Sequence, residues 1–112
     1  MNYIRPMLID FKDEDFENKI KKDEISICQF SAAWCGPCKS LKPIMDKFSE
    51  TYKDKAQNWF YCDVEDGAIN TGSTMGIRGV PTTIIFKKGV EVDRLVGNPG
   101  EATVKEFLDK NI

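Results

Sequence analysis

Two cysteines separated by two residues, Cys35 and Cys38, stand where an apolar segment gives way to a helical pattern. Residues 25–30 are short in extent, rich in β-branched side chains and poor in the polar residues of a half-solvated strand, so they predict a buried central strand. After the cysteines, apolar residues recur every three or four positions up to about Tyr52, which predicts a long helix. The cysteine pair is therefore expected at a strand-to-helix junction.

The remaining patterns predict a mixed sheet with helices on both faces. Further strands are expected over residues 3–9, 59–62, 82–86 and 90–96. Pro6 confines the first of them to a sheet edge, because proline cannot donate a ladder hydrogen bond. The last two are joined by a hairpin turn at residues 87–89.

Helices are expected over residues 12–24 and 101–112, with a short one somewhere within 65–76. Pro43 is expected to kink the long helix that follows the cysteines, since proline removes one helical hydrogen bond. The order of the elements predicts an α/β fold with about five strands and about four helices, in a single domain over residues 1–112.

Size and charge exclude several classes of protein. The chain has 112 residues, of which 41% are hydrophobic and 30% charged, a globular balance that argues against disorder. No apolar run approaches a membrane span, so no membrane association is expected. A formal net charge of -2 leaves no basic surplus for nucleic acid. The N-terminus lacks the pattern of a secretory signal, which favours a cytoplasmic location.

The cysteine pair predicts thiol–disulfide chemistry. Cys35 should lie at the helix N-terminus, where backbone N–H groups without helical partners favour the thiolate, the form that attacks disulfides. Cys38 follows one helical turn later on the same face, and we expect it to be more buried. It can attack the mixed disulfide once Cys35 has joined the substrate, so it is the expected resolving thiol.

A zinc site is the alternative for a Cys-x-x-Cys pair. Zinc usually takes four ligands, and the chain has no histidine and no second such pair, so no metal is expected. We also expect no bound cofactor. Cys28 and Cys62 lie on predicted strands. Isolated cysteines there are most often small buried hydrophobic residues, and we assign them no catalytic role.

Three segments occur in an order that resembles the thioredoxin family: Trp34-Cys35-Gly36-Pro37-Cys38-Lys39, then Gly76-Ile77-Arg78-Gly79-Val80-Pro81-Thr82, then Gly97. The resemblance covers nearly the whole chain. It implies a three-layer α/β/α fold and an enzyme that reduces protein disulfides. It also implies that a flavin-dependent reductase of the thioredoxin reductase type supplies electrons from NADPH. A monomer is expected.

The resemblance also implies roles for individual residues. Pro81 is expected to follow a cis peptide bond and to face the cysteines, with the backbone of Val80 pairing with an extended substrate. The expected substrate-binding residues are Trp34, Gly79, Val80, Pro81 and Gly97. The residues expected to tune the active site are Gly36, Pro37, Gln29 and Lys39.

The chain departs from the family pattern at two buried positions. Gln29 stands where the family typically has an aspartate, and Trp59 where it typically has a lysine on the adjacent strand. Glutamine cannot accept the proton of the resolving cysteine as a carboxylate would. We therefore expect slower or differently pH-dependent resolution, with a water held by Gln29 in place of a direct base. Ser31 stands where many relatives in the family have a bulky residue, and residues 63–81 form a longer stretch than usual. We expect these two differences to affect which reductase docks on the protein.

Two other functions fit the same fold. An oxidase or isomerase is less favoured, because oxidising relatives commonly place histidine before the second cysteine and this chain has Gly-Pro between the cysteines. A binding subunit with incidental cysteines is the other alternative. It would retain its biological activity after both cysteines were replaced by serine.

Overall fold

The computed structural model describes residues 7–112 and contains one five-stranded mixed sheet in the order β1–β3–β2–β4–β5. β1, β3 and β2 run parallel, whereas β4 and β5 are antiparallel to their neighbours. The strands are β1 (Ile9–Asp10), β2 (Ile25–Ser31), β3 (Asn58–Asp63), β4 (Thr82–Lys87) and β5 (Val90–Val96). The helices are α1 (Gly36–Thr51), α2 (Ile69–Thr74), α3 (Glu101–Asn111) and a short π-helical segment, η1 (Phe16–Ile20).

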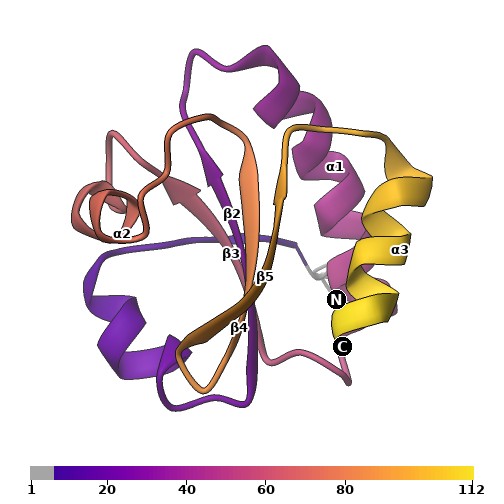
Figure 1. The fold of residues 1–112 in the computed structure, drawn as a ribbon, viewed down its shortest axis with the longest axis horizontal. Coiled ribbons are helices and arrows are strands. Elements are labelled where there is room, and N and C mark those ends of the chain that lie inside the picture. The colour runs from indigo at the N-terminus through magenta and orange to yellow at the C-terminus, as the bar shows by residue number, and fades with distance from the viewer. Residues whose placement is uncertain (1–6) are drawn as a thin grey trace, which may run out of the picture.

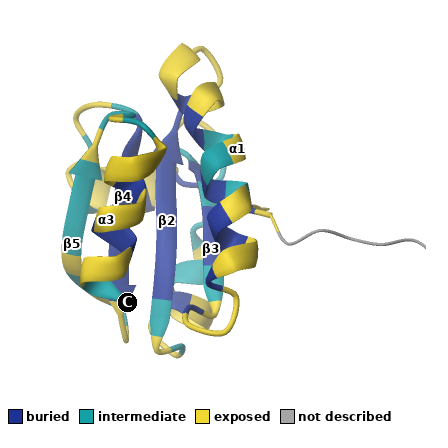
Figure 2. Ribbon diagram, turned by 90° about the vertical axis from the view of Figure 1, so that its right-hand side faces the viewer, coloured by how far each residue is buried: buried dark blue, intermediate teal, exposed yellow. Residues whose placement is uncertain are grey.

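The helices cover both faces of the sheet, which confirms the predicted three-layer α/β/α arrangement. α1 and α3 lie on one face, and η1 and α2 lie on the other (Figure 1). β2 is buried along almost its whole length between these layers (Figure 2), as predicted for the central strand. Because side chains alternate along it, Ile27 packs in the core under α1 while Phe30 packs in the core on the other face.

The start of α1 places the cysteine pair. Cys35 has extended backbone angles (φ −88°, ψ 109°) and caps the helix, and Pro37 lies in the first turn, where its missing N–H has no helical partner to lose. The buried face of the helix then anchors it on the sheet through Cys38, Leu41, Met45, Phe48 and Ser49. Pro43 lies inside the helix, which continues to Thr51. The kink at Pro43 stays a prediction.

The helix predicted over residues 12–24 is wrong in length. Its apolar side chains do pack on the core, but helical backbone covers only residues 14–20, and η1 is the last part of it, with a backbone hydrogen bond from Lys21 N to Phe16 O at 2.9 Å. That bond spans five residues instead of four, which is the pattern of a π-helix. Before it, Lys12 N donates to Asp15 Oδ2 at 3.0 Å, and the Asp13 carboxylate accepts from α2. These side-chain bonds hold residues 12–13 in a turn that leads into the helical segment.

The strand predicted over residues 3–9 is also mostly not confirmed. Residues 3–6, including Pro6, lie outside the described residues. Met7 and Leu8 are not in a strand, because Leu8 N donates to Asp46 Oδ1 of α1 at 2.7 Å. Only β1 remains, and it lies at the sheet edge, as predicted.

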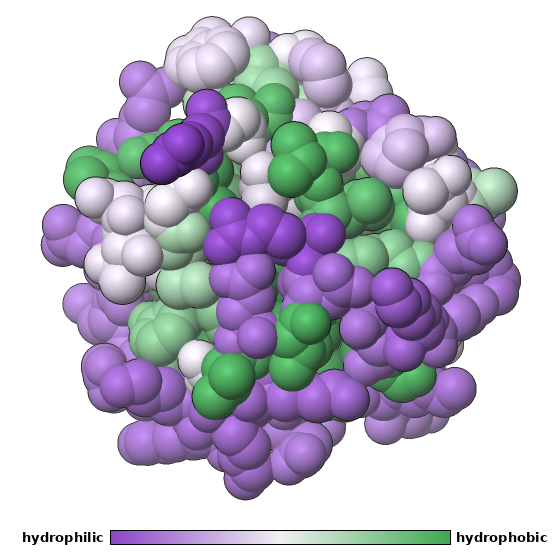
Figure 3. All heavy atoms as spheres, viewed as in Figure 1, coloured by the Kyte–Doolittle hydropathy of each residue, from purple (hydrophilic) through white to green (hydrophobic). Residues whose placement is uncertain are grey.

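The other predicted elements are present with bounds shifted by a few residues at most. The turn between β4 and β5 holds Lys88 and Gly89 at φ 52° and 82°, the left-handed angles of a tight hairpin. The surface mixes charged side chains with separate apolar patches (Figure 3), and β5 exposes Val90, Val92 and Val96. Within residues 7–112, none of the helices has the length and apolar character needed to traverse a bilayer.

Candidate active site

The two cysteines of the predicted motif form a disulfide at the N-terminus of α1. Their sulfur atoms are 2.22 Å apart and their Cα atoms 5.3 Å apart. The backbone N–H of Cys38 points at the sulfur of Cys35, with 3.2 Å between nitrogen and sulfur. The sulfur of Cys35 is therefore the acceptor for an N–H group that has no helical partner, which stabilises negative charge there when the disulfide is reduced.

The two cysteines differ in accessibility. Cys38 is completely buried, whereas 4% of Cys35 is exposed, so only Cys35 offers any surface to another molecule. The neighbouring residues Gly36, Pro37 and Lys39 are exposed on the first turn of α1. A partner disulfide can thus approach the pair only from the side of Cys35.

The loop before β4 lies against Cys35. The Val80–Pro81 peptide bond is cis, as predicted. The carbonyl oxygen of Val80 is 3.7 Å from the sulfur of Cys35. Gly97 N donates to Pro81 O at 2.7 Å, which joins the end of β5 to this loop. Gly79 is exposed, Val80 and Gly97 are half-buried and Pro81 is buried. Val80 thus contacts the sulfur of Cys35, although the two are distant in the sequence. Gly79 and Pro81 adjoin Val80 in the chain, and Gly97 is hydrogen-bonded to Pro81.

Trp34 precedes the cysteine pair and is 72% exposed, which is unusual for so large an apolar side chain. Its indole Nε1 donates to Glu65 Oε1 at 2.5 Å, and Glu65 N in turn donates to Asp63 Oδ1 at 2.9 Å. Glu65 was missed from the sequence, because it lies in the loop after β3 and no local pattern indicates a contact with a residue 31 positions earlier. It fixes the orientation of Trp34 beside the disulfide.

Gln29 lies beneath the first turn of α1 and is fully buried. Its Nε2 donates to the carbonyl oxygen of Cys38 at 3.1 Å and to Ser31 Oγ at 2.9 Å. Ser31 is itself fully buried, so its side chain does not reach a docking partner. Trp59 is buried on β3, paired in register with Ile27, and its Nε1 donates to Ala56 O at 3.2 Å. Gln29 thus contacts the backbone of the second cysteine directly.

Cys28 and Cys62 are free thiols buried in the core on the η1 and α2 face. Burial raises the pKa of the Cys62 thiol well above its ordinary value, and the neighbouring Cys28 thiol adds to this effect. A neutral thiol is a poor nucleophile, so Cys62 is not suited to attack a disulfide.

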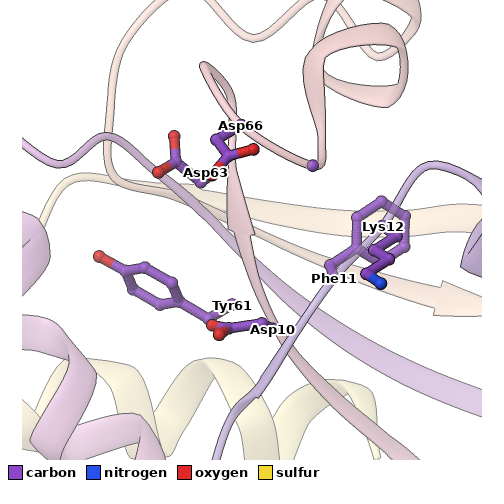
Figure 4. Close-up of a pocket in the computed structure, with 7 residues that line it drawn as sticks. Asp10, Phe11, Lys12, Tyr61, Asp63 and Asp66 are labelled. Atoms are coloured by element: carbon purple, nitrogen blue, oxygen red, sulfur yellow. The ribbon is translucent and has the colours of Figure 1, made fainter.

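A cavity of about 290 Å³ opens at the carboxyl ends of β1 and β3, and neither cysteine of the motif lines it. Figure 4 shows Asp63 and Asp66 on one side of it, with Tyr61 and Asp10 on the other. Over residues 7–112, no group of three or more histidine, cysteine or acidic side chains is placed to hold a metal ion.

Comparisons with known proteins agree with this geometry. The Thioredoxin family model matches residues 7–110. Thioredoxins from Staphylococcus aureus strains Mu50 and N315 are each 31% identical over 105 residues, which cover 94% of this chain and 98% of theirs. The crystal structure of Malassezia sympodialis thioredoxin superposes with a TM-score of 0.82 at 26% identity, over 98% of this chain and 96% of that one. The chain belongs to the thioredoxin family and is a dithiol–disulfide oxidoreductase.

Proposed function

We propose that the protein reduces disulfides in other proteins through two successive exchanges at its cysteine pair. The Cys35 thiolate attacks one sulfur of the substrate, which forms a mixed disulfide and releases the other substrate sulfur as a thiolate. The Cys38 thiol then loses its proton and attacks Cys35. The Cys35–Cys38 bond forms as the bond between Cys35 and the substrate breaks. The substrate has then gained two electrons and leaves with both sulfurs as thiols.

One observation supports these roles above all others: the N–H of Cys38 lies 3.2 Å from the sulfur of Cys35, at the N-terminus of a sixteen-residue helix. This arrangement favours negative charge on Cys35 and not on the buried Cys38. The first sulfur to react is therefore Cys35, and the complete burial of Cys38 keeps it from reacting with anything but its neighbour.

The substrate is proposed to lie across the surface formed by Trp34, Gly79, Val80, Pro81 and Gly97. The exposed indole of Trp34 offers apolar contact area next to the sulfur. Glycine at positions 79 and 97 leaves room for a second backbone, and the half-buried Val80 can pair with an extended chain. Gly36, Pro37 and Lys39 on the first turn of α1, with Gln29 below it, are proposed to tune the relative stability of dithiol and disulfide.

The oxidised pair must be reduced again after each cycle. We propose that a flavin-dependent enzyme of the thioredoxin reductase type does this with electrons from NADPH. The protein is further proposed to act as a single-domain monomer in the cytoplasm, where the reducing environment suits this direction of transfer.

The reduction of insulin by dithiothreitol tests the function. A catalytic amount of the protein should accelerate precipitation of the reduced insulin chains, and the Cys35→Ser variant should abolish the acceleration. The Cys38→Ser variant should instead accumulate a mixed disulfide with the substrate, visible by mass spectrometry. No acceleration by the unmodified protein, or full activity of Cys35→Ser, would contradict the proposal.

A further inference from the structure

Two buried polar atoms under α1 lack the partners that buried polar groups almost always have. Gln29 Oε1 and Thr83 Oγ1 make no hydrogen bond within residues 7–112, although Gln29 is fully buried and Thr83 is 1% exposed. Leaving a buried amide oxygen or hydroxyl without a partner is costly. Both atoms therefore need a polar group between or beside them.

The two residues are direct neighbours. Gln29 on β2 pairs in register with Thr83 on β4, so their side chains lie on the same face of the sheet, with Cβ atoms about 5 Å apart. This is the face that α1 covers. The two unpartnered atoms thus belong to adjacent side chains on one patch of the sheet.

The amide of Gln29 can point only one way. Its Nε2 donates to the carbonyl oxygen of Cys38, which can only accept, so turning the amide over would place two acceptor oxygens against each other. The oxygen Oε1 therefore remains as the buried acceptor without a partner, on a residue paired in register with Thr83.

From this geometry we propose that Gln29 Oε1 and Thr83 Oγ1 hold one water molecule beneath Cys38, and that this water takes the proton of Cys38 as it attacks. The water donates to Gln29 Oε1 and bonds to the Thr83 hydroxyl, and the reduced Cys38 thiol is the third partner that a buried water needs. Gln29 and Thr83 accept no proton themselves; they are positioning residues. The inference rests on the proposed role of Cys38 as the resolving thiol.

The resolving step balances with this water as a relay. The Cys38 sulfur forms a bond with Cys35 as the bond between Cys35 and the substrate sulfur breaks. The proton that Cys38 loses passes to the water, which releases a proton onward to the departing substrate thiolate or to solvent. Transfer through a positioned water lets a site without a buried carboxylate accept this proton.

The ionisable groups around this site come from α1 and β3. The neighbours of Gln29 along the register are Tyr61 on β3 and Thr83 on β4, and Lys42 of α1 lies over the Tyr61 ring at 5.7 Å. Asp46 forms an ion pair with Lys42 at 3.1 Å. On the same face, β5 and α3 contribute apolar side chains, which are Leu95, Val104 and Phe107. The titratable and charged groups named on this face are thus the two cysteines, Tyr61 and the Lys42–Asp46 pair.

Stopped-flow reaction of the reduced protein with dithiobis(nitrobenzoate) separates the two exchanges. The first coloured thiolate is released when Cys35 attacks, and the second when Cys38 resolves the mixed disulfide. Thr83→Val, which keeps the shape and removes the hydroxyl, should slow the second phase roughly tenfold, since a positioned proton transfer contributes about a hundredfold or more. It should also change the pH profile of that phase and leave the first phase unchanged.

Matched variants separate the relay from structural effects. Thr83→Ser, which keeps a hydroxyl at this position, should recover most of the rate. Ser49→Ala, which removes a buried hydroxyl on α1, should change neither phase. A second phase unaffected by Thr83→Val, equal slowing of both phases, or no recovery in Thr83→Ser would overturn the inference. Release of only one thiolate by the unmodified protein would instead contradict the proposed function.

A measurement on the unmodified protein covers the case in which Thr83→Val does not fold. A water held by Gln29 and Thr83 should give a nuclear Overhauser effect between solvent and the Gln29 side-chain amide protons in the reduced protein. Absence of this effect, with other buried waters detected, would overturn the inference.

Discussion

Gln29 is the residue whose chemistry departs most from the family pattern, and the charge at its position can be changed by one substitution. Gln29→Asp places a carboxylate below Cys38 in a fully buried site. An ionised carboxylate there is costly, so its pKa should rise and the variant should lose stability as the pH rises through that raised value. The free energy of unfolding at neutral pH should fall by about 2 kcal/mol or more.

The same variant should give the rate of insulin reduction a new dependence on pH, because an added base can now take the proton of Cys38. Gln29→Asn is the matched control, since it shortens the side chain equally without adding a charge. A rate profile for Gln29→Asp that coincides with that of Gln29→Asn would remove proton transfer at this position from the account.

Glu65 should determine how Trp34 is presented to substrates. Glu65→Ala removes the acceptor of the indole N–H, so the fluorescence anisotropy of Trp34 should fall when it is measured in a Trp59→Phe background. An exposed bond of this kind contributes about 1 kcal/mol or less, so the KM for insulin should rise by no more than about fivefold. Asp66→Ala, at the next residue of the loop, is the control, and an anisotropy equal in the two variants would show that Glu65 does not hold the indole.

At the scale of elements, the short helix α2 depends on a side chain from a distant turn. Asp13 accepts hydrogen bonds from Thr71 N at 2.8 Å, Thr71 Oγ1 at 2.7 Å and Asn70 N at 3.1 Å. Burial raises the pKa of Asp13, but these bonds outweigh it, and the net pKa lies below the ordinary value of 3.8. The carboxylate acts as a cap that α2 itself lacks.

Removing this cap should destabilise the protein. Asp13→Ala should lower the free energy of unfolding by about 1 kcal/mol at neutral pH, measured by urea denaturation. Because the folded pKa is lowered, the contribution is present above pH 3.8 and is lost as the pH falls through the folded value. The difference between the variant and the unmodified protein should therefore shrink in acid. A constant difference over this range, or an equal loss in the exposed Asp54→Ala, would contradict the capping role.

An element of this fold is predictable from the sequence where the interactions that determine it are local. The strand over residues 25–30 is predictable from its short run of apolar and β-branched residues, and the helix after Cys38 from its apolar periodicity. The helix predicted over residues 12–24 is too long, because the conformation of this segment depends on the hydrogen bonds from α2 to Asp13. Asp13 and Thr71 of α2 are 58 positions apart in the sequence. Local sequence patterns do not indicate such long-range hydrogen bonds.

The same limit applies to the site. Cys35, Cys38 and the cis bond before Pro81 could be inferred because the cysteine pair and the Val-Pro-Thr segment are specific motifs. Thr83 could not, because its role depends on facing Gln29 across two strands distant in the sequence. A threonine on a strand has no signal that separates it from any other β-branched residue.

For the whole molecule, the fold and the residues between the cysteines predict the direction of electron transfer. The reduction potential of the Cys35–Cys38 couple should lie below about −230 mV, more reducing than most glutaredoxins. Equilibration with a glutathione redox buffer, read out by mass spectrometry after acid quenching, measures it. A potential near −120 mV, the oxidising end of the range for this kind of couple, would favour the oxidase alternative.

The central claim is that α1 holds the sulfur of Cys35 as a thiolate. The most direct measurement is the rate at which iodoacetamide alkylates Cys35 as a function of pH, followed by mass spectrometry of the Cys35 peptide in the reduced protein, folded and in denaturant. We predict that the rate reaches half its maximum at a lower pH in the folded protein than in the unfolded chain, whatever the difference in absolute rate. A midpoint in the folded protein equal to or above that of the unfolded chain would contradict the account.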